Sequence, residues 1–151
     1  MPKLKNILVA HTTHSKEEDA RSTADFTLEI AKGSGTPVSK TFPKDKNLLH
    51  LNEPARQPGQ LDLYQFDVSA DNVNSDEPGF RITMKIQSGD AWLPQSIFVL
   101  GHTDIGQIVL LGYHPQWGSD TRRTPIETTM WFDKKVGTSD LVGLDTRVIS
   151  S

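Results

Sequence analysis

Glycine and proline are scattered along the whole chain, and this distribution limits the secondary structure that the chain can form. The 151 residues include 11 glycines and 9 prolines, and both residue types interrupt helices and mark turns, as at residues 78–79 and 104–106. Few windows between them reach the length of an amphipathic helix. Short segments separated by turn residues are typical of an all-β domain.

The segments between these turns alternate as β-strands do. Apolar side chains at positions 80, 82, 84 and 86 alternate with polar side chains at 81, 83, 85 and 87, so this strand buries one face and leaves the other in water. Similar segments predict eight short strands, at residues 4–12, 26–31, 38–42, 64–68, 80–87, 96–100, 107–111 and 128–132. We therefore predict an all-β fold, an eight-stranded antiparallel β-sandwich whose two sheets bury their alternating inner faces.

Two of the expected strands, residues 96–100 and 107–111, are apolar on both faces. We predict that both lie in the middle of a sheet, with other parts of the protein covering each side. His11 and His14 fall at the end of the first strand or in the loop after it. Histidines in such places are ordinarily surface residues.

The composition excludes several classes of protein. The formal net charge is -3, which disfavours a nucleic-acid partner because such binders present a basic surface. No apolar run approaches the roughly 18 residues of a membrane span, and residues 6–10 are too short for the apolar core of a signal peptide. We therefore expect a single domain over residues 1–151, cytoplasmic because no classical signal peptide is found, with non-classical secretion as the alternative. The chain has no cysteine, which excludes disulfides, thiolate metal sites and cysteine nucleophiles.

Several segments follow one another in the order of a known module. They are residues 20–26 leading into 27–30, residues 51–54, 59–66 and 81–86, Trp92 followed by 97–99, and Trp117. In this order they resemble the PLAT domain, the β-sandwich module shared by polycystins, lipoxygenases, lipases and clostridial alpha-toxin. Thr23 departs from the pattern, because the family has an Asp there. The resemblance covers most of the chain and implies a PLAT-like sandwich.

The resemblance also implies a function. It points to a non-catalytic interaction module that binds a lipid surface or a partner protein through the loops at one end of the sandwich. Several family members coordinate calcium there, and Ca²⁺ takes about six to eight oxygen ligands. The acids selected as metal ligands are Glu18, Asp19 and Asp25. Four further acids could approach across the same end: Asp71, Asp76, Asp90 and Asp104. The alternative is that all of these are solvated loop acids.

Tryptophans are the second group of candidate contact residues. Trp92 directly precedes an expected core strand, so we expect it in the core. Trp117 lies between a proline and a glycine, with two arginines just beyond, and ring and guanidinium groups together suit lipid head groups. The residues selected for ligand contact are Trp117, Arg122 and Arg123. The alternative function is a carbohydrate-binding sandwich, in which Trp117 and Trp131 would stack on sugar rings. Trp117 has a further interpretation without any ligand, in which its ring packs under a loop.

An enzyme is the third function class. His102, Asp104 and His114 have the order of the two imidazoles and one carboxylate that bind iron in non-haem oxygenases. Only nine residues separate Asp104 from His114, whereas the oxygenase fold places several strands between these ligands. The Gly-x-Ser-x-Gly motif of hydrolases is absent from the sequence. We therefore expect no catalytic activity, and calcium as the one cofactor that the resemblance implies.

Overall fold

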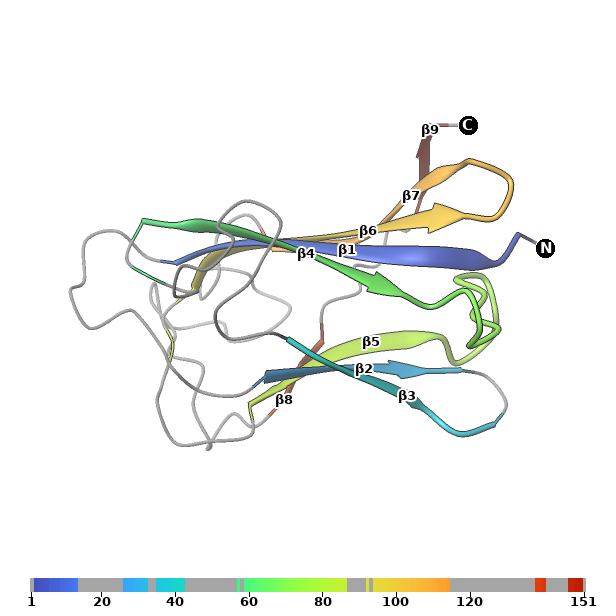
Figure 1. Cartoon of the computed structure of the whole chain (residues 1–151), viewed down its shortest axis with the longest axis horizontal. Helices are drawn as coiled ribbons and strands as arrows, with labels where there is room; N and C mark the ends of the chain where they lie inside the picture. Colours follow the sequence, from blue (N-terminus) through green and yellow to red (C-terminus); the bar gives the residue numbers. More distant parts are fainter. Residues whose placement is uncertain are drawn as a thin grey trace.

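The computed structural model describes residues 2–13, 26–32, 35–42, 57, 59–86, 92, 94–114, 138–140 and 147–150. These residues form two stacked sheets (Figure 1), a larger one with the order β4-β1-β6-β7-β9 and a smaller one with the order β3-β2-β5-β8. The strands are β1 (Leu4–Thr13), β2 (Phe26–Ala31), β3 (Val38–Thr41), β4 (Leu61–Asp67), β5 (Arg81–Ile86), β6 (Pro94–Thr103), β7 (Ile108–His114), β8 (Thr138–Asp140) and β9 (Arg147–Ser150). All neighbouring strands are antiparallel, so the predicted all-β sandwich is confirmed.

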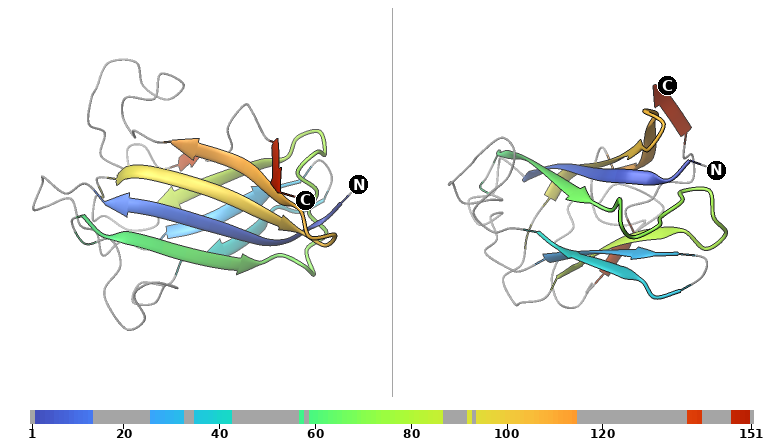
Figure 2. Two further views of the ribbon diagram at one scale, coloured as in Figure 1. Left: turned by 90° about the horizontal axis from the view of Figure 1, so that it is seen from above. Right: turned by 45° about the vertical axis from the view of Figure 1, so that its right-hand side comes forward.

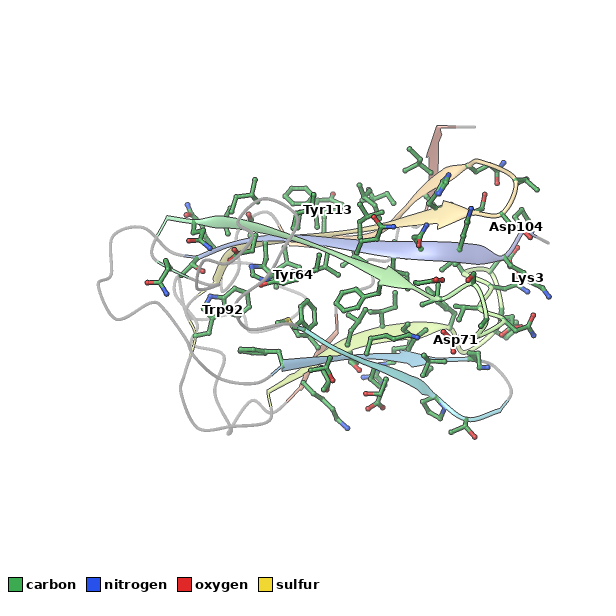
Figure 3. All side chains as sticks on the ribbon, viewed as in Figure 1. Lys3, Tyr64, Asp71, Trp92, Asp104 and Tyr113 are labelled. Carbon is green, nitrogen blue, oxygen red and sulfur yellow. The ribbon has the colours of Figure 1, made fainter. Side chains whose placement is uncertain are left out.

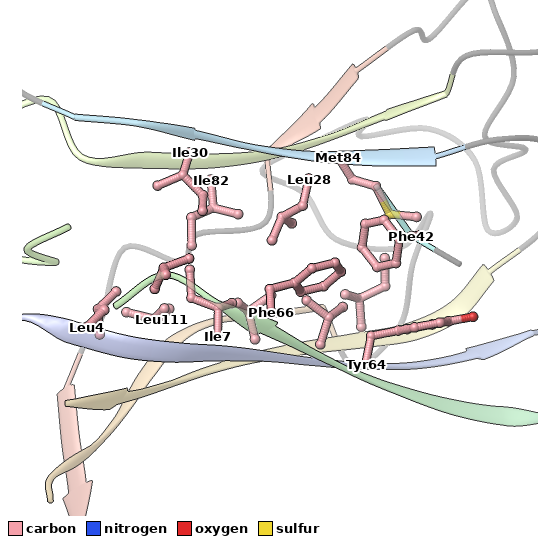
Figure 4. Packing of buried hydrophobic residues seen from close by; sticks show 14 of the residues in the cluster. Leu4, Ile7, Leu28, Ile30, Phe42, Tyr64, Phe66, Ile82, Met84 and Leu111 are labelled. Atoms are coloured by element: carbon pink, nitrogen blue, oxygen red, sulfur yellow. The ribbon is translucent and has the colours of Figure 1, made fainter. Parts of the chain in front are cut away.

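The two sheets are held together by the alternating residues on their facing sides. Ile7 and Val9 of β1 are fully buried, whereas the residues between and beside them are partly exposed. From the smaller sheet, Leu28, Ile30 and Ile82 are also fully buried. Figure 4 shows side chains of both sheets meeting between the layers. Because each buried aliphatic side chain contributes roughly 1.5–3 kcal/mol, these rows stabilise the stacked arrangement.

Seven of the eight predicted strands are present, with ends that differ by up to three residues. The eighth, at residues 128–132, lies outside the described residues. The described part of the chain contains two strands that the predicted set lacks, β8 and β9, and therefore nine strands instead of eight. β8 contains no apolar residue, so hydrophobic periodicity could not reveal it.

β6 and β7 lie inside the larger sheet, as their apolar sequences predict. β6 pairs with β1 and β7, and β7 pairs with β6 and β9. The predicted cover on both sides of these strands is wrong for the outer side, because Phe98 is 41% exposed and Ile108 36% exposed. Seen from above, strands β4, β1, β6 and β7 lie side by side (Figure 2). Their outward apolar residues therefore form a surface.

The β6–β7 hairpin closes through a turn that requires a glycine. Gly106 has a φ of 83°, a left-handed conformation that side chains with a Cβ rarely adopt. The Gln107 backbone N–H donates to the Thr103 hydroxyl oxygen at 2.9 Å. The turn leaves Ile105 at its tip 65% exposed. The turn predicted at residues 104–106 is confirmed.

Candidate functional site

The residues that the sequence selects as a site lie outside the described residues. They are the contact residues Trp117, Arg122 and Arg123 and the metal ligands Glu18, Asp19 and Asp25. Trp131, Asp90 and His14 also lie outside them. The roles assigned to these residues stay predictions.

Phe26, which directly follows Asp25, lies at the end of the sandwich where β1 terminates. Its ring packs on Trp92 with a centroid distance of 5.5 Å, and Trp92 hydrogen-bonds to Thr13, the last residue of β1. Asp104 lies at the opposite end, because its backbone N–H donates to the Lys3 carbonyl oxygen, just before β1 begins. Asp71 and Asp76 lie at this opposite end too, because Val73 between them pairs with Leu4. The prediction that Asp71, Asp76 and Asp104 approach the loop before Phe26 is therefore wrong, since the length of β1 separates them from it.

Asp71 and Asp104, at this opposite end, have partners within the protein (Figure 3). A carboxylate oxygen of Asp71 lies 3.0 Å from Nζ of Lys40. Asp104 accepts a hydrogen bond from the backbone N–H of Lys3 at 3.1 Å. Within the described ranges, no group of three or more histidine, aspartate or glutamate side chains lies together as a metal site would require.

His102 and His114 lie at different ends of the β6–β7 hairpin. His102 pairs with Ile108 beside the turn, whereas His114 pairs with Ile97 near the start of β6. Because a strand rises about 3.3 Å per residue, the two backbone positions are roughly 16 Å apart. The order of an iron-binding triad in the sequence is therefore not matched by proximity in space.

A buried polar cluster lies at the end of β1. His11 and Asp62 are both fully buried, with Nδ1 of His11 3.8 Å from Oδ2 of Asp62. The rings of Tyr64 and Trp92 pack on the imidazole at centroid distances of 5.3 and 4.7 Å. The indole N–H of Trp92 donates to the Thr13 hydroxyl at 2.9 Å. Because the imidazole and the carboxylate have no exposed surface, they cannot meet a dissolved substrate in this state.

Trp92 is fully buried, which confirms the prediction that it belongs to the core. The prediction that His11 lies at the surface is wrong, because His11 is fully buried. The signal that could have found it is parity: His11 follows Ile7 and Val9 at intervals of two, and β1 continues to Thr13. A strand that extends past a histidine keeps the histidine on the face that its spacing dictates.

The outer face of the larger sheet carries apolar side chains in register across four strands. The pairing places Leu63, Ala10, Phe98 and Tyr113 in one row from β4 to β7. The adjacent row contains Gln65, Leu8, Leu100 and Leu110. We define the apolar face as the nine apolar residues on this surface: Leu8, Ala10, Leu61, Leu63, Phe98, Leu100, Ile108, Leu110 and Tyr113.

Every residue of the apolar face contacts solvent. Leu61, Phe98 and Ile108 are the most open, at 44%, 41% and 36% exposed, and the other six are partly exposed. The rings of Phe98 and Tyr113 are stacked, with an interplanar angle of 14° and a centroid distance of 6.2 Å. A contiguous exposed apolar patch of this kind marks an interaction site more often than chance exposure does.

Asp67 stands at a corner of this surface as a stabilised carboxylate. Its Oδ1 accepts hydrogen bonds from the Ser69 hydroxyl at 2.6 Å and from the Ser69 backbone N–H at 2.9 Å. These bonds hold the pKa of Asp67 below its usual value, with smaller contributions from Lys40 and Lys5. The corner is therefore negatively charged at neutral pH, and His102, which pairs with Ile108, is the other ionisable side chain in the row of Asp67.

The outer face of the smaller sheet has the opposite character. Here Thr27 pairs with Lys85, and Glu29 pairs with Thr83. Nζ of Lys85 lies 3.0 Å from a carboxylate oxygen of Glu29. Hydroxyl groups of β3 extend this polar surface, so the smaller sheet presents an ordinary solvated face.

The fold defines a class, the antiparallel β-sandwich. No family model matches this chain, and no curated protein matches it. Among solved structures, the chain is similar to the alpha toxin from Clostridium absonum, with a TM-score of 0.54 and 14% sequence identity. The match covers 98% of this chain and 32% of the toxin chain, so this chain spans about a third of the toxin's length.

This likeness agrees with the fold that the sequence resemblance implies, since that family includes clostridial alpha-toxin. At 14% identity it concerns the fold alone. Within the described ranges, no helix has the length and hydropathy needed to cross a membrane. Function therefore has to be argued from the surfaces of this chain.

Proposed function

We propose that this chain is a non-catalytic interaction module that binds a partner protein through the apolar face. The observation that carries the proposal is the row of Leu63, Ala10, Phe98 and Tyr113, in which apolar side chains cross four strands and stay open to solvent. The core of a protein interface is depleted in charge and enriched in aromatic residues. The apolar face has both properties.

A partner protein suits this surface better than a lipid head-group region does. The paired outward positions of β4, β1, β6 and β7 hold no lysine or arginine, Arg147 of β9 pairs with Leu110 at the edge of the face, and the chain carries a net charge of -3. Anionic leaflets attract basic segments, at about 1 kcal/mol per lysine or arginine near the surface. Without such residues on the face, burial of apolar area has to supply the affinity, as it does in the centre of a protein interface.

The proposal is tested by photo-crosslinking, followed by affinity measurements on the purified proteins that are captured. A photoreactive side chain is placed at position 98, on the apolar face, or at position 83, on the polar outer face of the smaller sheet. We expect protein adducts from position 98 and not from position 83. Each captured protein is then purified, and its affinity for the intact chain is measured by titration calorimetry.

The substitution Phe98→Lys should weaken that affinity at least tenfold, because a buried unpaired charge opposes binding. Thr83→Lys is the matched control and should leave the affinity unchanged. No adduct at position 98, or a partner whose affinity ignores Phe98→Lys, would contradict the proposal.

Lipid binding through the end loops is the other function that the resemblance implies, and it rests on Trp117, Arg122 and Arg123. If the end loops bind anionic vesicles, flotation should decrease with added salt, and Trp117→Ala should reduce it without changing the fold. Calcium assistance has its own readout. Millimolar calcium should raise the melting temperature by mass action, and Asp25→Ala should abolish the rise. An unchanged melting temperature at several millimolar calcium would rule the site out.

Carbohydrate binding has one structural observation in its favour, the stacked rings of Phe98 and Tyr113 on an exposed sheet face. Aromatic rings with an apolar body and a polar tip suit amphipathic ligands. A glycan array separates this function from protein binding, because a sugar ligand should be lost on Phe98→Ala and should need no second protein.

A further inference from the structure

We infer that the apolar face binds a second copy of this chain, so that two sandwiches pack face to face about a two-fold axis that runs along the strands between β1 and β6. The inference rests on the proposed function and names the partner. Two sheets that pack by their faces lie about 10 Å apart. The same geometry already joins the two sheets within one molecule.

The distribution of charge suits a symmetric partner. In a two-fold interface each group meets the symmetric patch of the other copy, so charges near the axis meet like charges. Among the paired outward positions of β4, β1, β6 and β7, the ionisable side chains besides the Tyr113 phenol are Asp67 and His102, both in the row of Ile108 at one end of the face. Asp67 is at the β4 edge, where the two-fold axis places it beside Ile108 of the other copy at a corner of the interface, and its own counterpart lies at the opposite edge. The two carboxylates are then roughly 14 Å or more apart, beyond the screening length of about 8 Å at physiological salt.

The sizes of the side chains are also complementary under this symmetry. The rotation places β1 over β6 of the other copy, and β4 over β7. In the row across the sheet, Phe98 then faces Ala10 of the second copy, and Leu63 faces Tyr113. The Phe98–Ala10 pair, next to the axis, joins a long side chain to a short one and lets the two layers interdigitate as protein interiors do, whereas the two large side chains Leu63 and Tyr113 meet toward the edges.

The area is sufficient for a reversible dimer. Four strands spaced about 4.8 Å apart and four rows spaced about 6.8 Å apart, with the polar positions of the first and last rows included, give an outer face of roughly 500 Å². Two such faces bury roughly 1,000 Å², which reaches the lower limit for a specific interface and lies below the standard size. We therefore expect a dissociation constant in the micromolar range and no permanent dimer.

Sedimentation velocity of the intact chain, without lipid, over about 1 to 300 μM tests the inference. The sedimentation coefficient should rise with concentration from that of a monomer toward that of a dimer. Phe98→Lys should weaken dimerisation at least tenfold, because each dimer then contains two buried charges. Thr83→Lys introduces the same charge on the outer face of the smaller sheet and should dimerise like the unmodified chain.

Thermal melting of each variant shows whether it folds, and Leu61→Lys, at the corner of the apolar face, replaces Phe98→Lys if the latter unfolds. A chain that stays monomeric over the whole concentration range overturns the inference. A dimer whose dissociation constant is unchanged by both lysine substitutions also overturns it. Flotation with zwitterionic vesicles that Phe98→Lys abolishes would make lipid the occupant and would also overturn it.

The two proposals fail separately. A monomeric chain that still binds a different captured protein through position 98 leaves the proposed function standing without self-association. A chain that neither dimerises nor captures any protein at position 98 removes both.

Discussion

The outer faces of the two sheets follow the same alternation and carry different residues. On the smaller sheet, the outward positions of β2 and β5 hold threonines and the ion pair of Glu29 with Lys85. On the larger sheet, the equivalent positions of β1 and β6 hold Leu8, Ala10 and Phe98. Both faces contact solvent, yet only the smaller sheet has the composition that water favours.

This difference separates two kinds of information in a strand. The spacing of apolar residues fixes which side of a strand faces the core. The residues on the opposite side are free of that constraint, so their polarity indicates whether that face contacts solvent or another surface. Polar residues there indicate solvent, whereas apolar residues in register across four strands indicate a further contact.

The largest expected effect comes from a charge on the inner side of either sheet. Ile82→Asp and Val99→Asp each place a carboxylate in the core, and we expect a loss of at least about 4 kcal/mol in the free energy of unfolding, or no folded protein. On the outer sides the loss should be less than about 2 kcal/mol, because Phe98→Asp removes a ring that is 41% exposed and Thr83→Asp adds a carboxylate at a position paired with Glu29 and Asp140. Urea denaturation followed by circular dichroism measures all four variants.

Equal stability of Ile82→Asp and Thr83→Asp would remove the assigned phase of β5. Unfolding by Phe98→Asp would show that the apolar face is buried within one molecule, and the contrast between the two outer faces would then disappear.

A second prediction concerns the apolar character of the larger sheet's outer face. Replacing Leu61, Phe98 and Ile108 together by threonine should lower retention on a hydrophobic-interaction resin, because their exposed apolar area is removed. Stability should fall by less than about 1 kcal/mol per residue, since the core is unchanged. Adding methyl groups on the other sheet by Thr83→Ile should raise the retention. Retention that does not respond to the triple substitution would mean that other residues dominate the exposed apolar surface.

A smaller effect is expected from the ion pair on the polar face. Glu29 and Lys85 are both partly exposed, and such pairs contribute about 0.2–1 kcal/mol. A double-mutant cycle with Glu29→Ala and Lys85→Ala should give a coupling energy in this range that declines as salt is added. A coupling energy that persists in high salt would contradict the solvated character of this face.

The smallest effect concerns Asp67 and Ser69 at the corner of the apolar face. NMR titration of the Asp67 carboxyl should give a pKa below the ordinary value of about 3.9, and Ser69→Ala should raise it. Because the folded pKa is lowered, the stabilising contribution is present above the unfolded pKa and is lost as the pH falls through the folded pKa. The free energies of unfolding of the unmodified chain and of Ser69→Ala should therefore differ most at neutral pH and become equal in strong acid. An unchanged pKa in Ser69→Ala would show that the hydroxyl does not stabilise the carboxylate.

Alternation was enough to predict the sandwich and seven of its strands, because burial of one face is a local property of the sequence. It could not reveal β8, whose residues Thr138, Ser139 and Asp140 are all polar. His11 was misplaced although the predicted strand at residues 4–12 includes it, because its polar side chain was given more weight than its spacing from Ile7 and Val9. The two apolar strands were placed correctly inside the sheet, but their outer side was wrongly expected to be covered.

The candidate site was harder to predict for a physical reason. The resemblance directed attention to loop residues such as Trp117 and Asp25, which lie outside the described residues. The apolar face is assembled from four strands, and no single strand reveals it. Leu63 and Ala10 become neighbours of Phe98 only through the pairing of β4 and β6 with β1. The register between strands depends on tertiary structure and cannot be predicted from the sequence of a single strand.

The position of β1 within the larger sheet also affects how the chain folds during synthesis. β1 is the earliest strand in the sequence, and both of its neighbours, β4 and β6, come much later. At roughly 5–20 residues per second, a ribosome needs on the order of ten seconds to extend the chain from β1 to β6. Until β4 emerges the apolar residues of β1 have neither partner strand, and until β6 emerges they have only one, so the nascent chain is exposed to aggregation before this long-range pairing is complete.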